Sequence, residues 1–169
     1  MDIQPTDGQS DKPDYIKTIY QDPPLVFRNF SNDQISEFLA LTDYVEYEKS
    51  ELILKEAEEV EVAYLVVGGR VSVWKESIQL ITMSEGDFIG ETFVFPGNNR
   101  IANVIADDHC SLLRFERKKV LAYLRKKPRK LTKLFTRNLI LIQENKMSHM
   151  NKQLITLKKK LQQFSDSDE

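Results

Sequence analysis

The chain has 169 residues, 41% of them hydrophobic, and a formal net charge of −2 from 24 basic and 26 acidic residues. This length predicts one domain with an extension, and the charge balance gives no overall attraction to nucleic acid or acidic membranes. The longest aliphatic run, residues 139–142, is far shorter than the ~20 residues of a membrane span, and the N-terminus lacks a signal-peptide pattern. We therefore expect a cytoplasmic protein without membrane contact. Cys110 is alone and forms no intrachain disulfide, which agrees with a reducing compartment.

Residues 1–24 contain four prolines and few apolar side chains, which predicts a disordered N-terminal arm. An alternative remains open for residues 15–20, whose aromatic and aliphatic side chains suit docking in a surface groove. The first helix is expected after Ser31, because Ser31 and Gln34 have the spacing of a capping box and the apolar residues that follow share one helical face. This helix is predicted to cover the elements that come next.

From residue 44 to residue 115 the pattern indicates β-strands. Short runs rich in Val, Ile, Leu, Tyr and Phe are separated by polar or glycine-containing turns, which predicts an antiparallel sandwich or barrel. The expected strands are residues 45–47, 52–54, 63–67, 71–74, 78–82, 101–106 and 111–115.

After residue 115 apolar side chains recur at helical spacing. Residues 118–127 predict a short helix that ends at Pro128, and residues 128–164 predict a long one. A helix of ~36 residues rises about 54 Å, more than a domain of this size covers, so part of it is expected to project. Six apolar residues in that part alternate at spacings of three and four, as in a coiled coil: Met147, Met150, Leu154, Leu157, Leu161 and Phe164. We expect a parallel homodimer through this seam; the alternative is a helix that bends back or frays beyond about residue 150.

The remaining features of the chain predict little chemistry outside one loop. The basic run 158–160 is interpreted as a solvated face, and residues 165–169 as a disordered acidic tail, which leaves residues 25–127 for the folded domain. His109 and His149 have no cysteine or carboxylate at metal-ligand spacing, so no metal is expected. No nucleophile has a plausible base and orienting partner, so we do not expect an enzyme.

The segment 86–106 predicts a ligand site. A Gly-Asp pair forms a turn at its start, and Gly90 and Glu91 begin a one-turn helix whose unpaired N–H groups suit an anion. Arg100 follows Glu91 by nine residues, so an acid and a base bracket a loop that is otherwise apolar. The alternative is a structural salt bridge of Arg100 with Glu91 or Asp87.

The pattern Gly-Asp-x-x-Gly-Glu, followed nine residues after the glutamate by Arg-x-Ala-x-Val-x-Ala, resembles the phosphate-binding cassette of cyclic nucleotide-binding domains. These are the sensory domains of catabolite-activator-type regulators and of protein kinase A regulatory subunits. The resemblance covers about residues 25–145 and implies a mainly β fold, an eight-stranded jelly-roll-like β-roll with a short N-terminal helix and a long C-terminal helix. It also implies that Arg100 binds the cyclic phosphate, and Glu91 the ribose 2′-hydroxyl, of a nucleotide such as cAMP. The implied site comprises Gly90, Glu91, Thr92, Arg100, Ile101 and Ala102.

Some positions depart from the family pattern. Members that bind nucleotide have a small residue where Phe93 stands, and Ala, Ser or Thr where Ile101 stands. Ser50 and Ala57 replace glycines of the family, for which we expect a changed turn type rather than positive φ. The resemblance places contacts to the base on the long helix, at Arg137, Asn138 and Asn145.

Two functions remain open. The first is a non-enzymatic sensor of a cyclic nucleotide, cAMP rather than cGMP, that passes its ligand state through the long dimerising helix to an unknown protein partner. Because the chain has no residues for a helix-turn-helix after that helix, we expect no sequence-specific DNA binding. The second is a degenerate domain in which the Phe93 ring fills the pocket and the dimer serves as a protein-interaction scaffold.

Overall fold

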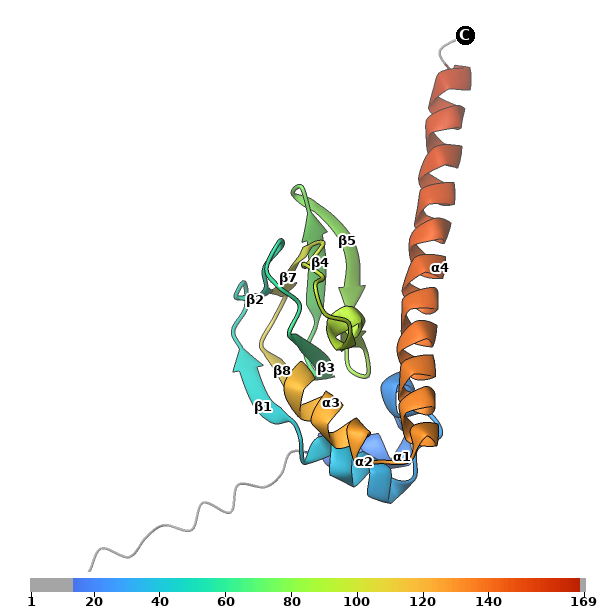
Figure 1. The fold of residues 1–169 in the computed structure, drawn as a ribbon. Helices are drawn as coiled ribbons and strands as arrows, with labels where there is room; N and C mark the ends of the chain where they lie inside the picture. Colours follow the sequence, from blue (N-terminus) through green and yellow to red (C-terminus); the bar gives the residue numbers. More distant parts are fainter. Residues whose placement is uncertain (1–13, 168–169) are drawn as a thin grey trace, which may run out of the picture.

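Two four-stranded antiparallel sheets form the centre of the protein, whose computed structural model describes residues 14–167. The first sheet has the order β1 (Asp43–Tyr47), β8 (Cys110–Glu116), β3 (Val62–Gly68) and β6 (Phe88–Ile89). The second has the order β2 (Leu52–Leu54), β7 (Asn103–Ala106), β4 (Val71–Lys75) and β5 (Ile78–Met83). The eight strands confirm the predicted β-roll (Figure 1).

The alternation of side chains along β3 explains why this strand is apolar on both faces. Ala63 and Leu65 point to a hydrophobic cluster beneath the helices, whereas Tyr64 and Val66 point to a second cluster between the sheets. Successive residues of a strand face opposite sides, so a strand covered on both faces is buried along its length. The first sheet therefore separates two cores, one inside the β-roll and one under the helices.

The helices pack on the outer face of the first sheet. They are η1 (Leu25–Phe27), α2 (Asn32–Leu39), α3 (Arg117–Arg125) and α4 (Arg129–Ser167). The capping box before α2 is present as predicted, since the Ser31 hydroxyl accepts from the Gln34 N–H and the Gln34 side chain accepts from the Ser31 N–H.

The long helix α4 has two distinct parts (Figure 1). Leu131, Phe135, Leu139 and Ile142 recur at helical spacing and are buried in the cluster beneath the helices. From residue 147 to residue 165 every side chain of α4 is exposed. The second part therefore projects beyond the β-roll, as its length predicts.

A helix replaces part of the predicted N-terminal arm. Residues Tyr15–Gln21 form α1, whereas the composition predicted disorder up to about residue 24. Ile19 is buried in the cluster beneath the helices, and the Tyr15 ring stacks on Tyr44 with centroids 5.7 Å apart. The docked alternative is therefore the correct one for this segment, while residues 1–13 lie outside the described residues.

The two turns that flank β2 keep the backbone conformation of glycine without having glycine. Ser50 has φ 73° and Ala57 has φ 67°, both in the left-handed region. The prediction of a changed turn type is therefore wrong at both positions. Backbone pairing imposes the conformation, because Ser50 N donates to Ala106 O at 2.8 Å and Ala57 N donates to Arg100 O at 2.9 Å.

Candidate functional site

The predicted ligand loop connects β6 to β7 and contains the one-turn helix η2 (Glu91–Val94). Gly90, just before η2, has φ 79°, and a Cβ at this position would lie 2.6 Å from the Arg100 Nη1 atom and 3.2 Å from the Val62 carbonyl oxygen. Only glycine fits so close to the guanidinium in this conformation. Gly90 therefore brings the start of η2 against the side chain of Arg100.

Arg100 is a buried cation, with 9% of its surface exposed. Its backbone is held by a hydrogen bond from its N–H to Glu58 O at 2.8 Å, and its Nη2 donates to the Val62 carbonyl. Burial lowers the pKa of its guanidinium from the usual value, and the neighbouring Tyr64, Glu58 and Glu91 counter only part of that effect.

No carboxylate in the described part of the chain forms an ion pair with Arg100. Asp87, one of the two predicted structural partners, instead accepts a hydrogen bond from the Ser84 N–H at 2.8 Å. A charged group out of water normally has a counter-ion, because its desolvation is otherwise uncompensated. The structure therefore contradicts the alternative of a structural salt bridge for Arg100.

Glu91 has a partner that the sequence did not suggest. Its Oε2 lies 2.8 Å from the Nζ of Lys146 on α4, and the same Nζ donates to the Phe88 carbonyl at 2.7 Å. The side chains of Glu91 and Lys146 are only 11% and 21% exposed. A signal for this contact was available, because Lys146 follows the buried Ile142 by four residues and so continues the apolar face of α4.

Phe93 and Ile101, the two departures from the family pattern, lie in opposite environments. Phe93 is fully buried in the cluster beneath the helices, with its ring centroid 6.1 Å from that of Phe88. Its ring anchors η2 to that core. Ile101 is 81% exposed, and its side chain is directed to solvent.

The other predicted site residues are divided between the surface and the interior. Gly90, Glu91 and Arg100 lie together, whereas Thr92 is exposed on η2 and Ala102 is buried just before β7. Ile101 and Ala102 precede β7 (Asn103–Ala106), so this strand begins two residues later than the predicted strand 101–106.

The predicted base contacts on α4 do not converge on the loop. Asn138 is buried, and its Nδ2 donates to Val26 O at 3.1 Å and to Arg28 O at 2.9 Å. These bonds hold η1 against α4, which makes Asn138 a structural residue. Arg137 and Asn145 are exposed.

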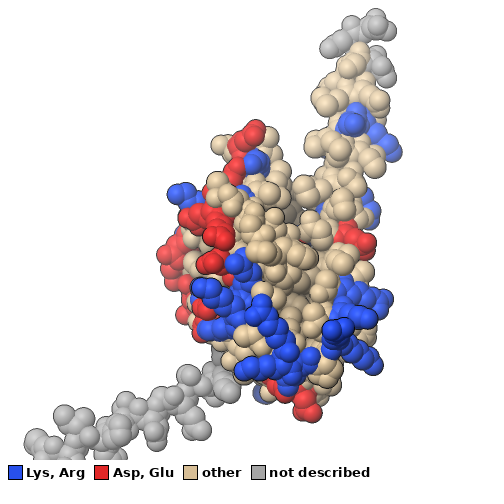
Figure 2. Space-filling model, viewed as in Figure 1, with Lys and Arg blue, Asp and Glu red and all other residues tan. Residues whose placement is uncertain are grey.

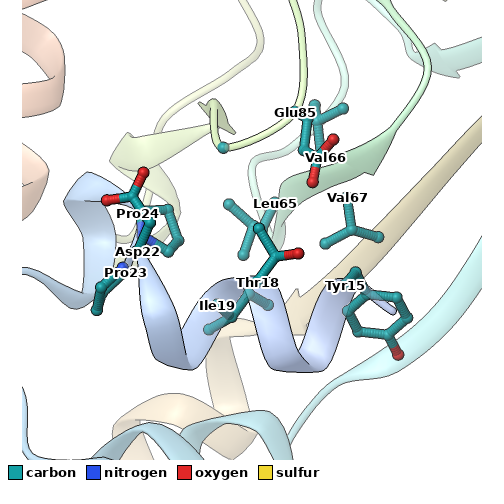
Figure 3. A pocket seen from close by; sticks show the side chains of 11 residues that line it. Tyr15, Thr18, Ile19, Asp22, Pro23, Pro24, Leu65, Val66, Val67 and Glu85 are labelled. Atoms are coloured by element: carbon teal, nitrogen blue, oxygen red, sulfur yellow. The ribbon is translucent and has the colours of Figure 1, made fainter. Parts of the chain in front are cut away.

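A cavity of about 290 Å³ lies elsewhere, between α1 and β3 (Figure 3). Tyr15 and Ile19 of α1 face Leu65 and Val67 of β3 across it, and Glu85 lies at its edge. Neither Glu91 nor Arg100 lines this cavity. It is therefore separate from the loop that carries the buried cation.

Residues 14–167 meet neither the requirements of a metal site nor those of a membrane-spanning helix. No group of three or more His, Cys, Asp or Glu side chains in this range is placed to hold a metal ion. None of the helices in the same range is both long and apolar enough to cross a membrane.

Comparison with known proteins agrees with this geometry. Residues 44–127 match the sequence model of the family described as cyclic nucleotide-binding domain. A cGMP-dependent protein kinase of Drosophila melanogaster is 31% identical over 90 residues, which are 53% of this chain and 8% of the kinase. The chain thus matches only a small part of this kinase.

Solved structures share the fold at low identity. A cyclic nucleotide-binding domain from Methylobacillus flagellatus superimposes with a TM-score of 0.74 and 18% identity, over 84% of this chain and 83% of that one. The catabolite activator protein of Thermus thermophilus gives a TM-score of 0.66 and 19% identity, over 79% of this chain and 63% of that one. Through residues 44–127, the chain belongs to the cyclic nucleotide-binding domain family.

Proposed function

We propose that the protein is a non-enzymatic sensor of a cyclic nucleotide, with Arg100 binding the cyclic phosphate and Glu91 accepting a hydrogen bond from the ribose 2′-hydroxyl. The observation that carries this proposal is the burial of Arg100 without a carboxylate partner. A phosphate supplies the missing counter-charge, and a guanidinium offers it a planar fork of donors. Gly90 supports the assignment, because it leaves room beside Nη1 that any side chain would fill.

The nucleotide we propose is cAMP, with cGMP as the second candidate. Ile101 follows Arg100 and has no hydroxyl, so this position offers no hydrogen bond to a guanine. Because the chain is similar to a cGMP-dependent kinase, the binding experiment below also includes cGMP.

The output of the sensor is proposed to pass through α4. Lys146 holds this helix to Glu91, which is the residue that the ribose would use. A ligand that shares or displaces this contact changes the energy of the helix position, and an effector can shift an equilibrium only through such a difference.

A homodimer is proposed to receive that change and present it to a protein partner. Met147, Met150, Leu154, Leu157, Leu161 and Phe164 are between 43% and 72% exposed in the single chain. A continuous apolar seam of this kind is stabilised by a second helix in a parallel coiled coil.

The contact between Lys146 and Glu91 also favours a second candidate, a degenerate domain that serves as a scaffold. In this alternative Lys146 has taken the place of the ribose hydroxyl permanently, and the loop no longer binds nucleotide. Phe93 no longer supports it, since the ring lies in the core beneath the helices.

Thermal unfolding with saturating cAMP, cGMP and cyclic dinucleotides separates the two candidates. Ligand at 100 times its Kd adds about 2.7 kcal/mol of stability, or roughly 5–10 °C in midpoint for a chain of this length. We expect that shift with cAMP in the wild type and in the control Arg129→Ala, and its loss in Arg100→Lys, which keeps the charge without the fork. The absence of a shift with every nucleotide would leave the scaffold as the function.

A further inference from the structure

One segment of the chain is strongly basic although the protein as a whole is not. Residues 117–137 contain ten lysines and arginines and no acidic residue, in a chain whose net charge is −2. The compensating acids gather elsewhere, with seven glutamates in residues 46–61. The nearly balanced net charge of the whole chain therefore conceals a local region of positive potential at residues 117–137.

Most of these basic side chains have no partner. Arg117, Lys119 and Lys127 form ion pairs with Glu61, Asp43 and Glu37, respectively. The other seven make no ion pair or side-chain hydrogen bond with the described residues, and all are exposed. They are Lys118, Arg125, Lys126, Arg129, Lys130, Lys133 and Arg137; we call them the basic face.

The basic face is divided between two packed helices. Figure 2 shows one group of cations over α3 and another over the first turns of α4, with uncharged surface between them. On α4, Arg129, Lys133 and Arg137 recur every four residues, so each lies about 6 Å beyond the last along the helix.

The arrangement of these groups can be compared with a nucleic-acid duplex. The two groups lie on different helices with uncharged surface between them, as two phosphate strands lie on either side of the ~12 Å wide major groove. The row on α4 spans about 12 Å, the length that three or four phosphates of one strand occupy along the duplex axis.

The basic face lacks the groups that other anionic partners use. No large apolar side chain between residues 117 and 137 is among the exposed ones, because Val120, Leu124, Leu131 and Phe135 are buried in the core. An inserting membrane-surface helix needs an apolar face, a protein interface centres on an apolar or aromatic anchor, and single strands bind through stacking on exposed rings. Anionic lipid headgroups attract a basic cluster without insertion, so vesicles are included in the test below. A double-stranded phosphate backbone needs only the cations.

We infer that the basic face binds the phosphate backbones of double-stranded DNA without reading base sequence. This goes beyond the proposed sensor function and does not depend on it, because none of the seven side chains belongs to the loop of Arg100. Contacts from lysine and arginine side chains to phosphates fix the position of a duplex and carry no base sequence, which is why the binding is sequence-independent.

Fluorescence anisotropy of the full chain on labelled duplexes of about 20 base pairs, at salt concentrations from about 50 to 200 mM, tests this inference. With up to seven phosphate contacts, log affinity is expected to fall against log salt with a slope of up to about −6. Two unrelated duplex sequences are expected to give the same curve.

The triple variant Lys130→Gln/Lys133→Gln/Arg137→Gln is expected to make that slope shallower by about 3. The matched control Lys158→Gln/Lys159→Gln/Lys160→Gln changes the net charge equally on the projecting part of α4 and is expected to leave the slope unchanged. Thermal unfolding checks that both variants are folded. Equal losses in the two triples, or no duplex binding by the wild type at the lowest salt, would overturn the inference. So would tighter binding to phosphatidylserine vesicles, poly-glutamate or a single strand than to duplex.

Discussion

Arg100 has, at the scale of single side chains, the environment expected of a ligand-binding residue rather than of a structural one. Both backbone groups of Arg100 are paired, yet its guanidinium is buried next to Gly90 with one carbonyl acceptor and without an ion pair to a carboxylate. Folding alone gains little from such a charge.

This arrangement predicts that the free protein does not need the Arg100 charge for stability. Arg100→Met keeps an unbranched side chain and removes the buried cation, so the free energy of unfolding without ligand is expected to stay equal or rise by up to about 1 kcal/mol. Urea unfolding monitored by circular dichroism measures it. A loss of more than about 2 kcal/mol would mean that Arg100 has a structural role.

Ser50 and Ala57 predict a gain in stability. Both have positive φ, where a Cβ costs about 1–2 kcal/mol, while glycine costs about 0.5–1 kcal/mol of unfolded-state entropy. Ala57→Gly and Ser50→Gly are therefore each expected to raise the free energy of unfolding by roughly 0.5–1 kcal/mol. The control Ala122→Gly, within α3, is expected to lower it by a similar amount.

Spacing along the chain was enough to find part of the site. Glu91 and Arg100 lie within ten residues of each other on one loop, so their proximity follows from local sequence. Lys146 is 55 residues from Glu91, and only the packing of α4 brings it there. The two positive-φ turns were missed for a similar reason, since strand pairing overrides the local preference of Ser and Ala.

At the scale of elements, α4 is linked to the loop by one ion pair. Glu91 and Lys146 are both less than a quarter exposed, so screening by solvent is limited but present. The Phe88 carbonyl adds a second acceptor for the same ammonium. This contact is followed along α4 by side chains that are all exposed, from residue 147 to residue 165.

A double-mutant cycle with Glu91→Gln and Lys146→Met is expected to give a coupling energy of about 1–2 kcal/mol in urea unfolding. The control cycle pairs Glu91→Gln with Lys152→Met, an exposed lysine farther along α4, and is expected to give no coupling. Equal values in the two cycles would show that the ion pair does not hold the helix.

The strands and the capped helix α2 were predictable because their signals are local. Alternation of side chains and the Ser31 to Gln34 spacing operate within a few residues. β6 has two residues and exists through its pairing with β3, and α1 is stabilised by burial of Ile19 and stacking on Tyr44. A short helix has little stability of its own, so these contacts decide its formation.

At the scale of the whole molecule, the projecting part of α4 predicts the state of association. Leu154 lies in the seam and is 51% exposed in the single chain; its neighbour Ile155 is 55% exposed and lies outside the seam. Leu154→Asp is expected to convert a dimer to a monomer at micromolar concentration, whereas Ile155→Asp is expected to leave the dimer intact. Sedimentation equilibrium measures both, and a monomeric wild type would contradict the proposed coiled coil.

The position of Lys146 leaves a long part of α4 beyond the contact with Glu91. The 21 residues of α4 that follow Lys146 extend about 32 Å past the contact with Glu91. A tilt of only about 10° around that contact would move the far end by about 5 Å, close to the rise of one helical turn. A small rearrangement at the Glu91 carboxylate, the proposed ribose contact, would thus produce a larger displacement at the far end of α4, with the helix as the lever arm and the Glu91 contact as its fulcrum.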